Sequence, residues 1–461
     1  MNIKQDRKPR LIVGEVAHDR AKIWGRGDAE HSVMFVESEP NGTLVKKLSP
    51  EDGYTGTVEL RGLAADKNYS VTVSYGPTTD TRIEDRVQQR QGKFETPPPP
   101  DQSEPFSLLL NSCNFHGWGP IRNNDKANKR RGQVAEGVDM VLHTGDQVYA
   151  DKAPISFTTQ EFRGVYEKQW ADEGVPELLS SQANYMIADD HEVVNGFAEG
   201  GQLTRLQRLI LWLRGHGMQK EKQYREMAEN GVKVFSEFQR SHAPTTFGED
   251  VNYYTFEHGK HKFFALDTGL NRDHENGKMI SSEQQKALFS WLTDNRDNPK
   301  FILTSTPFVM EYKKPDDKWT SPEWNAQRDE IIDFLATEKL DNVVFLAGDV
   351  HASGHARLTI EAGDGESFVI DELTSSAVNA SVMRGREKFV GVRPGETSNG
   401  TRYRVELDEE SFLGKGGRFN GISNSNVMRI DIDDDRVDYA VYRTRHGEEA
   451  PVRTGGFLIS G

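Results

Sequence analysis

The sequence predicts an α/β protein in two parts, a small β-sandwich module followed by a larger domain of strands and helices. Before residue 97, short stretches of alternating apolar character are separated by Gly, Asp and Asn turns, which is the spacing expected of a sandwich. A proline run at 97–100 then ends this pattern, and short apolar strands alternate with amphipathic helices after it. These observations predict a module at 1–96, a linker at 97–105 and a mixed α/β domain at 106–461.

The N-terminal module is expected to contain five strands. Leu63, followed by Tyr69 and Val71, looks like the turn and strand of a fibronectin-type or immunoglobulin-like sandwich. Prolines lack backbone donors, so the linker is expected to be stiff and extended. The predicted strands are Leu11–Val13, Ala21–Trp24, Val33–Val36, Thr57–Leu60 and Tyr69–Tyr75.

The larger domain is predicted to be a mixed α/β domain in which helices lie between the strands. A helix should open at a capping box of Ser282 and Gln285, and another at Ser321. A helical insertion around 199–242 carries Leu203, Leu206, Ile210 and Leu213 at helical spacing, which favours a core stripe. The predicted strands are Phe106–Leu110, Val138–Leu142, Tyr185–Ala188, Lys262–Leu266, Phe301–Leu303 and Val343–Leu346, with Val427–Ile432 and Val437–Tyr442 added to a second sheet.

Composition limits the functions that fit this chain. The 461 residues carry a formal net charge of -15, which argues against nucleic-acid binding as a dedicated function and requires a local cationic feature to attract an anionic substrate. No stretch is apolar enough to span a membrane, and the polar start shows no signal peptide. We therefore expect a cytoplasmic protein, or a periplasmic or secreted one if the chain was trimmed. With Cys113 as the one cysteine, no internal disulfide forms. The sequence leaves the oligomeric state open.

Metal-ligand side chains follow four of the predicted strands. Cys113 follows the first, Asp146 and Tyr149 the second, Asp189-Asp190-His191-Glu192 the third, and Asp349 and His351 a later one. Such strand ends share one edge of an open α/β sheet. Thiolate, phenolate, carboxylate and imidazole suit iron, manganese or zinc, while oxygen ligands suit calcium or magnesium.

Each residue alone has an ordinary structural interpretation. Cys113 would be a small buried hydrophobe, Tyr149 a core aromatic and His191 a surface ion-pair partner. The joint pattern favours a metal site, because ligand types recur at the strand ends where a ligand would bind.

These motifs resemble the PhoD-type alkaline phosphatase family, within the calcineurin-like metallophosphoesterases, and the resemblance implies that the larger domain is a β-sandwich flanked by helices. The Gly-Asp-x-x-Tyr element is also similar to the purple acid phosphatases, where the tyrosine binds ferric iron. The likeness covers nearly the whole chain and is carried by Ser112-Cys113, Gly145-Asp146-Gln147-Val148-Tyr149-Ala150-Asp151, Asp189-Asp190-His191-Glu192, Leu266-Asp267-Thr268 and Gly348-Asp349-Val350-His351.

The resemblance implies a ligand set for two or more metal ions. One metal would be held by Cys113, Asp146, Tyr149 and His351, and a second by Asp146, Asp190 and Asp349, with Asn195 as a further candidate. A thiolate and a phenolate on one cation favour Fe³⁺, with Ca²⁺ at the second site and Zn²⁺, Mn²⁺ or Mg²⁺ as alternatives.

The resemblance also assigns other roles. His191 matches the histidine that gives a proton beside the phosphate. Related chains often have Leu-Asp-Thr-Arg where this one has Leu266-Asp267-Thr268-Gly269, so the nearest arginine, Arg272, becomes the candidate for substrate binding.

The predicted function is metal-dependent hydrolysis of phosphate monoesters or diesters, with a small phosphorylated molecule as substrate. Two cations roughly 3.5–4 Å apart would neutralise the phosphate and hold a hydroxide in line with the leaving group. Asp146, which is proposed to touch both cations, and His191 are the candidate catalytic residues. The alternative is a catalytically weak metal-binding or scaffold protein that retains the site.

Overall fold

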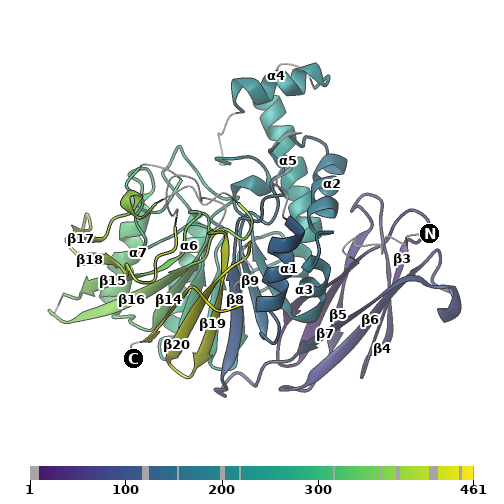
Figure 1. The fold of residues 1–461 in the computed structure, drawn as a ribbon, viewed down its shortest axis with the longest axis horizontal. Helices are drawn as coiled ribbons and strands as arrows, with labels where there is room; N and C mark the ends of the chain where they lie inside the picture. The colour runs from purple at the N-terminus through teal and green to yellow at the C-terminus, as the bar shows by residue number, and fades with distance from the viewer. Residues whose placement is uncertain are drawn as a thin grey trace.

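The computed structural model describes residues 10–116, 124–152, 155–197, 203–216, 220–314, 317–363, 365–380, 385–414, 424–445 and 449–459. Strands in these ranges form four sheets, with three, four, six and eight members. Two sheets belong to the N-terminal part and two to the larger part (Figure 1). Within the described ranges, no helix has the length and apolar character needed to cross a membrane.

The N-terminal part contains seven antiparallel strands. One sheet has the order β1-β2-β5 and the other β4-β3-β6-β7. The five predicted strands are confirmed, while β4 and β7 were missed because most of their side chains are polar or exposed. The strands are β1 Leu11–Val16, β2 Arg20–Arg26, β3 Val33–Ser38, β4 Gly42–Lys47, β5 Thr55–Arg61, β6 Asn68–Gly76 and β7 Val87–Glu95.

The larger part is built on two mixed sheets. The six-stranded sheet has the order β10-β9-β8-β19-β20-β21, in which the first three strands are parallel. Its strands are β8 Phe106–Asn111, β9 Met140–Thr144, β10 Ala183–Ile187, β19 Asn426–Asp433, β20 Arg436–Arg443 and β21 Arg453–Leu458.

The eight-stranded sheet has the order β11-β12-β13-β14-β16-β15-β18-β17. Its centre, from β12 to β16, is parallel. The strands are β11 Tyr254–His258, β12 His261–Ala265, β13 Lys300–Leu303, β14 Val343–Ala347, β15 Gly354–Glu361, β16 Ser367–Thr374, β17 Val392–Glu396 and β18 Arg402–Leu407.

The layers of the larger part follow from alternation along its strands. In β8, Leu108 and Leu110 face the cluster between the two sheets, while Leu109 faces the cluster under the helices. In β14, Val344 and Leu346 face the same central cluster, and Phe345 faces the opposite way. Both faces of these two central strands are therefore buried, whereas β18 and β20 alternate between buried and more exposed side chains. The predicted sandwich flanked by helices is present (Figure 1).

The helices cover the outer faces of these two sheets. Helices α6 and α7 contribute to the cluster outside the eight-stranded sheet, and α2, α3 and α5 to that outside the six-stranded sheet. Their bounds are α1 Asn124–Val134, α2 Thr159–Gln169, α3 Val175–Ser181, α4 Arg205–Leu213, α5 Lys220–Phe238, α6 Ser282–Asp294 and α7 Asn325–Glu338.

Two helix starts differ from the sequence prediction. Ser281, not Ser282, is the N-cap of α6, and its side chain accepts from the Gln284 backbone N–H. Helix α7 begins at Asn325 with no side-chain cap, so Ser321 precedes it by a turn. Ser-x-x-Gln occurs twice here, as Ser281-x-x-Gln284 and Ser282-x-x-Gln285, and the helix begins at the earlier of the two.

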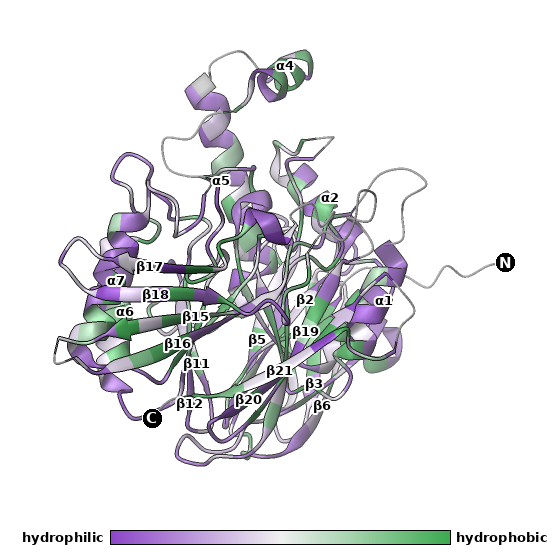
Figure 2. Cartoon of the chain, turned by 60° about the vertical axis from the view of Figure 1, so that its left-hand side comes forward, coloured by the Kyte–Doolittle hydropathy of each residue, from purple (hydrophilic) through white to green (hydrophobic). Residues whose placement is uncertain are grey.

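The predicted core stripe in the insertion is wrong at two of its four positions. Figure 2 shows α4 at the end of an arm that projects from the body. Leu206 and Leu213 are 66% and 70% exposed, whereas Leu203 is buried and Ile210 is half-buried against the cluster under the helices. Periodicity identified the helix correctly, but it does not show which face meets the protein.

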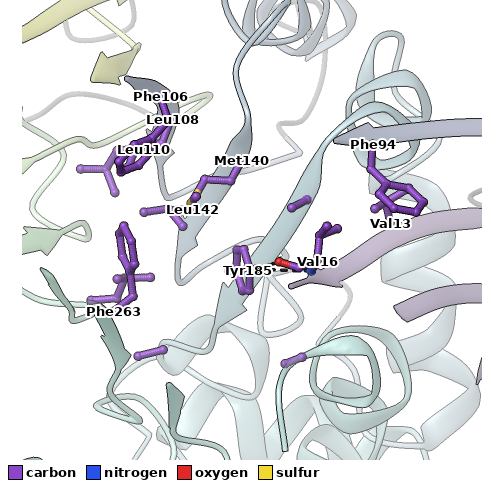
Figure 3. Close-up of a cluster of buried hydrophobic side chains, with 14 of the residues drawn as sticks. Val13, Val16, Phe94, Phe106, Leu108, Leu110, Met140, Leu142, Tyr185 and Phe263 are labelled. Carbon is purple, nitrogen blue, oxygen red and sulfur yellow. Dashed lines mark hydrogen bonds between the residues drawn. The ribbon is translucent and has the colours of Figure 1, made fainter. Parts of the chain in front are cut away.

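The N-terminal part packs directly on the larger part. The Tyr185 hydroxyl of β10 donates to Val16 O of β1 at 2.9 Å and accepts from Val16 N at 3.3 Å. Figure 3 shows residues of both parts in a single buried cluster, including Val13, Phe94 and Leu142. The indole of Trp24, fully buried, donates to Glu237 O of α5 at 2.8 Å. The two parts therefore share a hydrophobic core.

Candidate metal centre

Four loops that leave parallel strands meet at one edge of the sandwich. Cys113 follows β8, Asp146 follows β9, and Asp190 follows β10, and these three strands are neighbours in one sheet. Asp349 and His351 follow β14 of the facing sheet. The predicted convergence of these strand ends is confirmed.

Two glycines allow the loops to approach so closely. A Cβ at Gly145, where φ is +89°, would lie 2.5 Å from the Asp189 Cβ. A Cβ at Gly348 would lie 2.6 Å from the Ser112 Cβ. Any side chain at either position would push apart two of the ligand-bearing loops, which explains the Gly-Asp pairs seen in the sequence.

The backbone is held in an unusual conformation at four of the candidate ligands. Cys113, Asp146, Asp349 and His351 have φ values of +56°, +55°, +62° and +49°, and they make up four of the nine described non-glycine residues with positive φ. Such conformations cost of order 1–3 kcal/mol each and cluster at functional sites. Strain is therefore concentrated where the loops present their side chains.

Cys113, Asp146, Tyr149 and His351 form one group of contacts. The Cys113 Sγ lies 3.5 Å from Asp146 Oδ2, and the Tyr149 hydroxyl lies 3.4 Å from His351 Nε2. Ser376 ties the group together, because its Oγ donates to Cys113 Sγ at 3.2 Å and accepts from the His351 backbone N–H at 3.1 Å. All four residues that the sequence assigned to the first metal are brought together.

The carboxylates form two further groups that share Asp146. Ligand atoms of Asp146, Asp190 and His191 lie within 4.8 Å of one another, and so do those of Asp146, Asp189 and Asp349. Asp146 is therefore common to both groups, and its predicted bridging of two metals stays a prediction. Asp189 is the addition, since sequence reasoning placed it in the motif without a ligand role.

His191 is oriented by the carboxylate of Asp151, in the loop that follows β9. Its Nδ1 lies 2.7 Å from Asp151 Oδ1, and its ring stacks against that of Tyr149 with centroids 4.2 Å apart. Burial disfavours the charged ring, but Asp190, Asp146 and Asp151 outweigh it and raise the pKa of His191 to about 10. The hydrogen bond to Nδ1 leaves Nε2 as the nitrogen that can meet a ligand.

Glu192 connects the loops that follow β9 and β10 through hydrogen bonds to their backbones. Its Oε2 accepts from the backbone N–H groups of Asp146 and Asp189, both at 3.0 Å, and its Oε1 accepts from that of Gln147 at 2.7 Å. Gln239 of the segment after α5 adds a fourth hydrogen bond at 3.2 Å. Fully buried, Glu192 positions the ligand loops without being a ligand itself.

The electrostatics of the centre favour a bound cation. Burial, with neighbouring Asp146 and then Asp349, raises the pKa of the Cys113 thiol well above its usual range. Burial also raises the pKa of Asp146 and Asp189, and carboxylates around them add to the effect. Asp189 Oδ2 is buried without a hydrogen-bond partner among the described residues. Acidic donors crowded in this way fit a metal site, because a cation stabilises all their charged forms together.

Comparison with known proteins gives the family. The profile of the PhoD-like phosphatases matches residues 108–416. The chain belongs to the PhoD-like phosphatase family. A relative, alkaline phosphatase D of Bacillus subtilis (strain 168), is 23% identical over an alignment of 431 positions that covers 84% of this chain. The match spans 65% of that relative, slightly under two thirds of its length.

Solved structures with the same fold agree with this placement. A structure of PhoD aligns with a TM-score of 0.71 at 17% identity, covering 100% of this chain and 92% of that one. A purple acid phosphatase from yellow lupin (Lupinus luteus) seeds aligns with a TM-score of 0.61 at 13% identity, covering 97% and 74% of the two chains. The mixed α/β metallophosphoesterase-like fold is therefore confirmed.

Gly269, which stands where related chains often have an arginine, has a structural explanation. A Cβ at Gly269 would lie 2.4 Å from Ala188 O, so no arginine fits there with this backbone. Arg272 is buried instead, with Nη2 paired to Asp189, Nη1 to Asp317 at 3.0 Å, and Nε donating to Thr268 O. In this arrangement Arg272 positions Asp189, and its predicted contact with substrate stays a prediction.

Two other residues complete the surroundings. Lys318, 3% exposed, pairs with Asp349 and with Asp317. Sequence reasoning missed it because it lies in the connection between β13 and α7 rather than at a strand end. Asn195 is exposed, and its backbone N–H donates to Asp151 Oδ2 at 3.4 Å; its predicted ligation stays a prediction.

Proposed function

We propose that this PhoD-like chain is a metal-dependent phosphoesterase that hydrolyses small phosphate monoesters or diesters. The observation that carries the proposal is the position of Asp146, whose carboxylate is common to two groups of ligand atoms. A carboxylate placed in this way suits a two-metal site, the arrangement that phosphatases use. Membership of the PhoD-like family supports the same activity.

The proposed metals follow from the donors. Cys113, Tyr149, His351 and Asp146 would hold Fe³⁺, because a thiolate and a phenolate are strong donors that suit a transition metal. Asp190 and Asp349 would share Asp146 with the second ion, for which oxygen donors favour Ca²⁺. Asp189 joins this second set as a candidate because its Oδ2 is buried and lacks a described partner.

The chemistry is divided between the ions and the chain. When bound, two such ions supply positive charge to the phosphate oxygens and lower the pKa of water. Asp151 fixes the His191 ring through Nδ1, so that Nε2 can pass a proton to the departing alcohol oxygen. Glu192 keeps Asp146 and Asp189 in place through their backbone N–H groups.

The N-terminal part is proposed to be a fibronectin-like sandwich domain over 1–96, joined by the linker 97–105 to the catalytic domain 106–461. Two observations support this assignment. The strand orders β1-β2-β5 and β4-β3-β6-β7 are those of a two-sheet Greek-key sandwich. The Tyr69 hydroxyl, at the start of β6, accepts from the Ala64 backbone N–H at 2.7 Å, which is the contact of a tyrosine corner.

The test is nitrophenol release from nitrophenyl phosphate and bis-(nitrophenyl) phosphate. The protein would be purified after metal-replete expression and measured before and after treatment with a chelator. We expect turnover that the chelator removes and that added metal restores. A protein that binds metal stoichiometrically but turns over neither ester would contradict the proposal, and would favour the metal-binding or scaffold alternative.

A further inference from the structure

A pocket of about 250 Å³ lies beside the candidate metal centre, on the side of Tyr149. Its apolar lining includes Phe115, Tyr149, Ile155 and Val165. The Phe115 and Tyr149 rings meet edge to face, with centroids 5.0 Å apart. Since a cavity of about 150 Å³ already admits benzene, this pocket has room for one substituted aromatic ring.

The pocket connects with the proposed reaction centre through two residues. Tyr149 lines the pocket, and its hydroxyl lies 3.4 Å from His351 Nε2. Lys152 also lines it, and its Nζ lies 3.2 Å from Asp151 Oδ2, the carboxylate that orients His191. A molecule whose phosphate occupied the metal centre could therefore place its organic group in the pocket.

A glycine in the middle of α2, Gly164, belongs to the lining of the pocket. A Cβ there would have no heavy atom within 4 Å. The other described glycines within helices differ, because a Cβ at Gly132 or Gly231 would meet neighbours at 3.3 Å and 3.1 Å. Glycine weakens a helix interior relative to alanine. Close packing explains the other two glycines, whereas a Cβ at Gly164 would meet open space.

The charged lining fits an ester more than a neutral ring. Lys152 and Lys168 both line the pocket, in a chain whose formal net charge is -15. Glu161, the acidic side chain of the lining, is engaged at the start of α2, where it accepts from the backbone N–H of Thr158 at 3.0 Å and pairs with Arg214. Lys168 therefore offers a local attraction for an anionic substrate, while Lys152 is paired with Asp151.

We propose that this pocket is a subsite for an aromatic ring carried by the organic group of the phosphoester substrate. The proposal rests on the proposed function for the position of the phosphate. Tyr149 and Phe115 would contact the ring, Val165 and Ile155 would exclude water from it, and the space beside Gly164 would admit its outer edge.

The test measures binding, so that it does not depend on turnover. Phenylphosphonate and methylphosphonate would be titrated calorimetrically into the metal-loaded protein. The variants are Gly164→Leu, which places a side chain in the open space, and Gln160→Leu, which adds the same side chain at an exposed position of α2 that does not line the pocket. Thermal melting would check each fold.

We expect the wild type and Gln160→Leu to bind phenylphosphonate about tenfold or more tighter than methylphosphonate, the ratio that burial of one ring supplies. In Gly164→Leu the preference should fall to about twofold or less, while methylphosphonate binds as before and the Tm is unchanged or higher. Equal binding of the two phosphonates to the wild type would overturn the subsite, as would a preference that survives in Gly164→Leu. Nitrophenyl phosphate turnover, measured separately, would show whether the proposed hydrolysis fails independently.

Discussion

Glu192→Gln changes one buried atom from an acceptor to a donor directly beneath the candidate metal centre. Each carboxylate oxygen of Glu192 serves two donors: Oε2 accepts from Asp146 N and Asp189 N, and Oε1 from Gln147 N and Gln239 Nε2. A glutamine supplies only one oxygen. In either orientation of its amide, at least one backbone N–H of a ligand loop faces an NH₂ group.

The expected cost combines two opposing effects. A buried donor without a partner costs about 1–3 kcal/mol, and one or two backbone donors lose theirs. Removing the negative charge of Glu192 offsets part of this free-energy cost, because Glu192 is one of the carboxylates that raise the pKa of Asp146. We expect a net loss of about 1–3 kcal/mol in stability. Since the loops also present Asp146 and Asp189, metal binding should weaken by about 10–100-fold.

Glu372→Gln is the matched control. Glu372 is also buried, and it accepts from the backbone N–H groups of Phe308, Val309 and Met310 at 2.6, 2.9 and 2.8 Å. That segment carries none of the candidate ligands. Both variants should melt at lower temperature, but only Glu192→Gln should lose metal in a titration against a competing chelator. Equal metal affinity in Glu192→Gln and wild type, or equal loss in both variants, would refute the positioning role.

Three further predictions follow from the same contacts. His191→Ala should keep both metals but slow hydrolysis by about 10²–10⁴-fold for esters with poor leaving groups and less for nitrophenyl esters; an equal loss for all esters would indicate a metal or phosphate ligand. Deleting residues 1–95 should lower the Tm, because removing Trp24 and β1 exposes the surface of the larger part that they cover. A truncated protein as stable as the full chain would contradict the shared core. Iron-loaded protein should be coloured by an absorption band in the visible range. Tyr149→Phe should shift or remove this band, and Cys113→Ser should perturb it separately. An unchanged band in Tyr149→Phe would exclude Tyr149 as a ligand.

The sequence predicted the parts of this protein that depend on strand ends. Short apolar runs identified the strands that bear the ligands, and the carboxyl ends of parallel strands meet at one edge. Cys113, Asp146 and Asp349 could therefore be placed together before any coordinates. The Gly145 and Gly348 contacts show that the same loops need glycine to approach one another.

The remaining features depend on contacts between residues far apart in the sequence, which the periodicity of single elements does not predict. Lys318 reaches Asp349 from a long connection, and Ser376 reaches Cys113 from beyond β16. Glu192 follows a candidate catalytic histidine, yet its role is set by three backbone N–H groups from two loops. The face of α4 was misassigned because a helical stripe looks the same whether it meets a core or projects from the body.

The measurement that tests the account most directly is the metal content of wild type and Asp146→Asn by elemental analysis, paired with nitrophenyl phosphate turnover. Asparagine keeps the shape of the side chain but removes the charge and one of the two oxygens that would bridge the ions. We predict at least two metal equivalents and turnover in the wild type, and loss of one or both metals with loss of turnover in Asp146→Asn. Wild-type metal content and turnover in Asp146→Asn would contradict a centre built around this carboxylate.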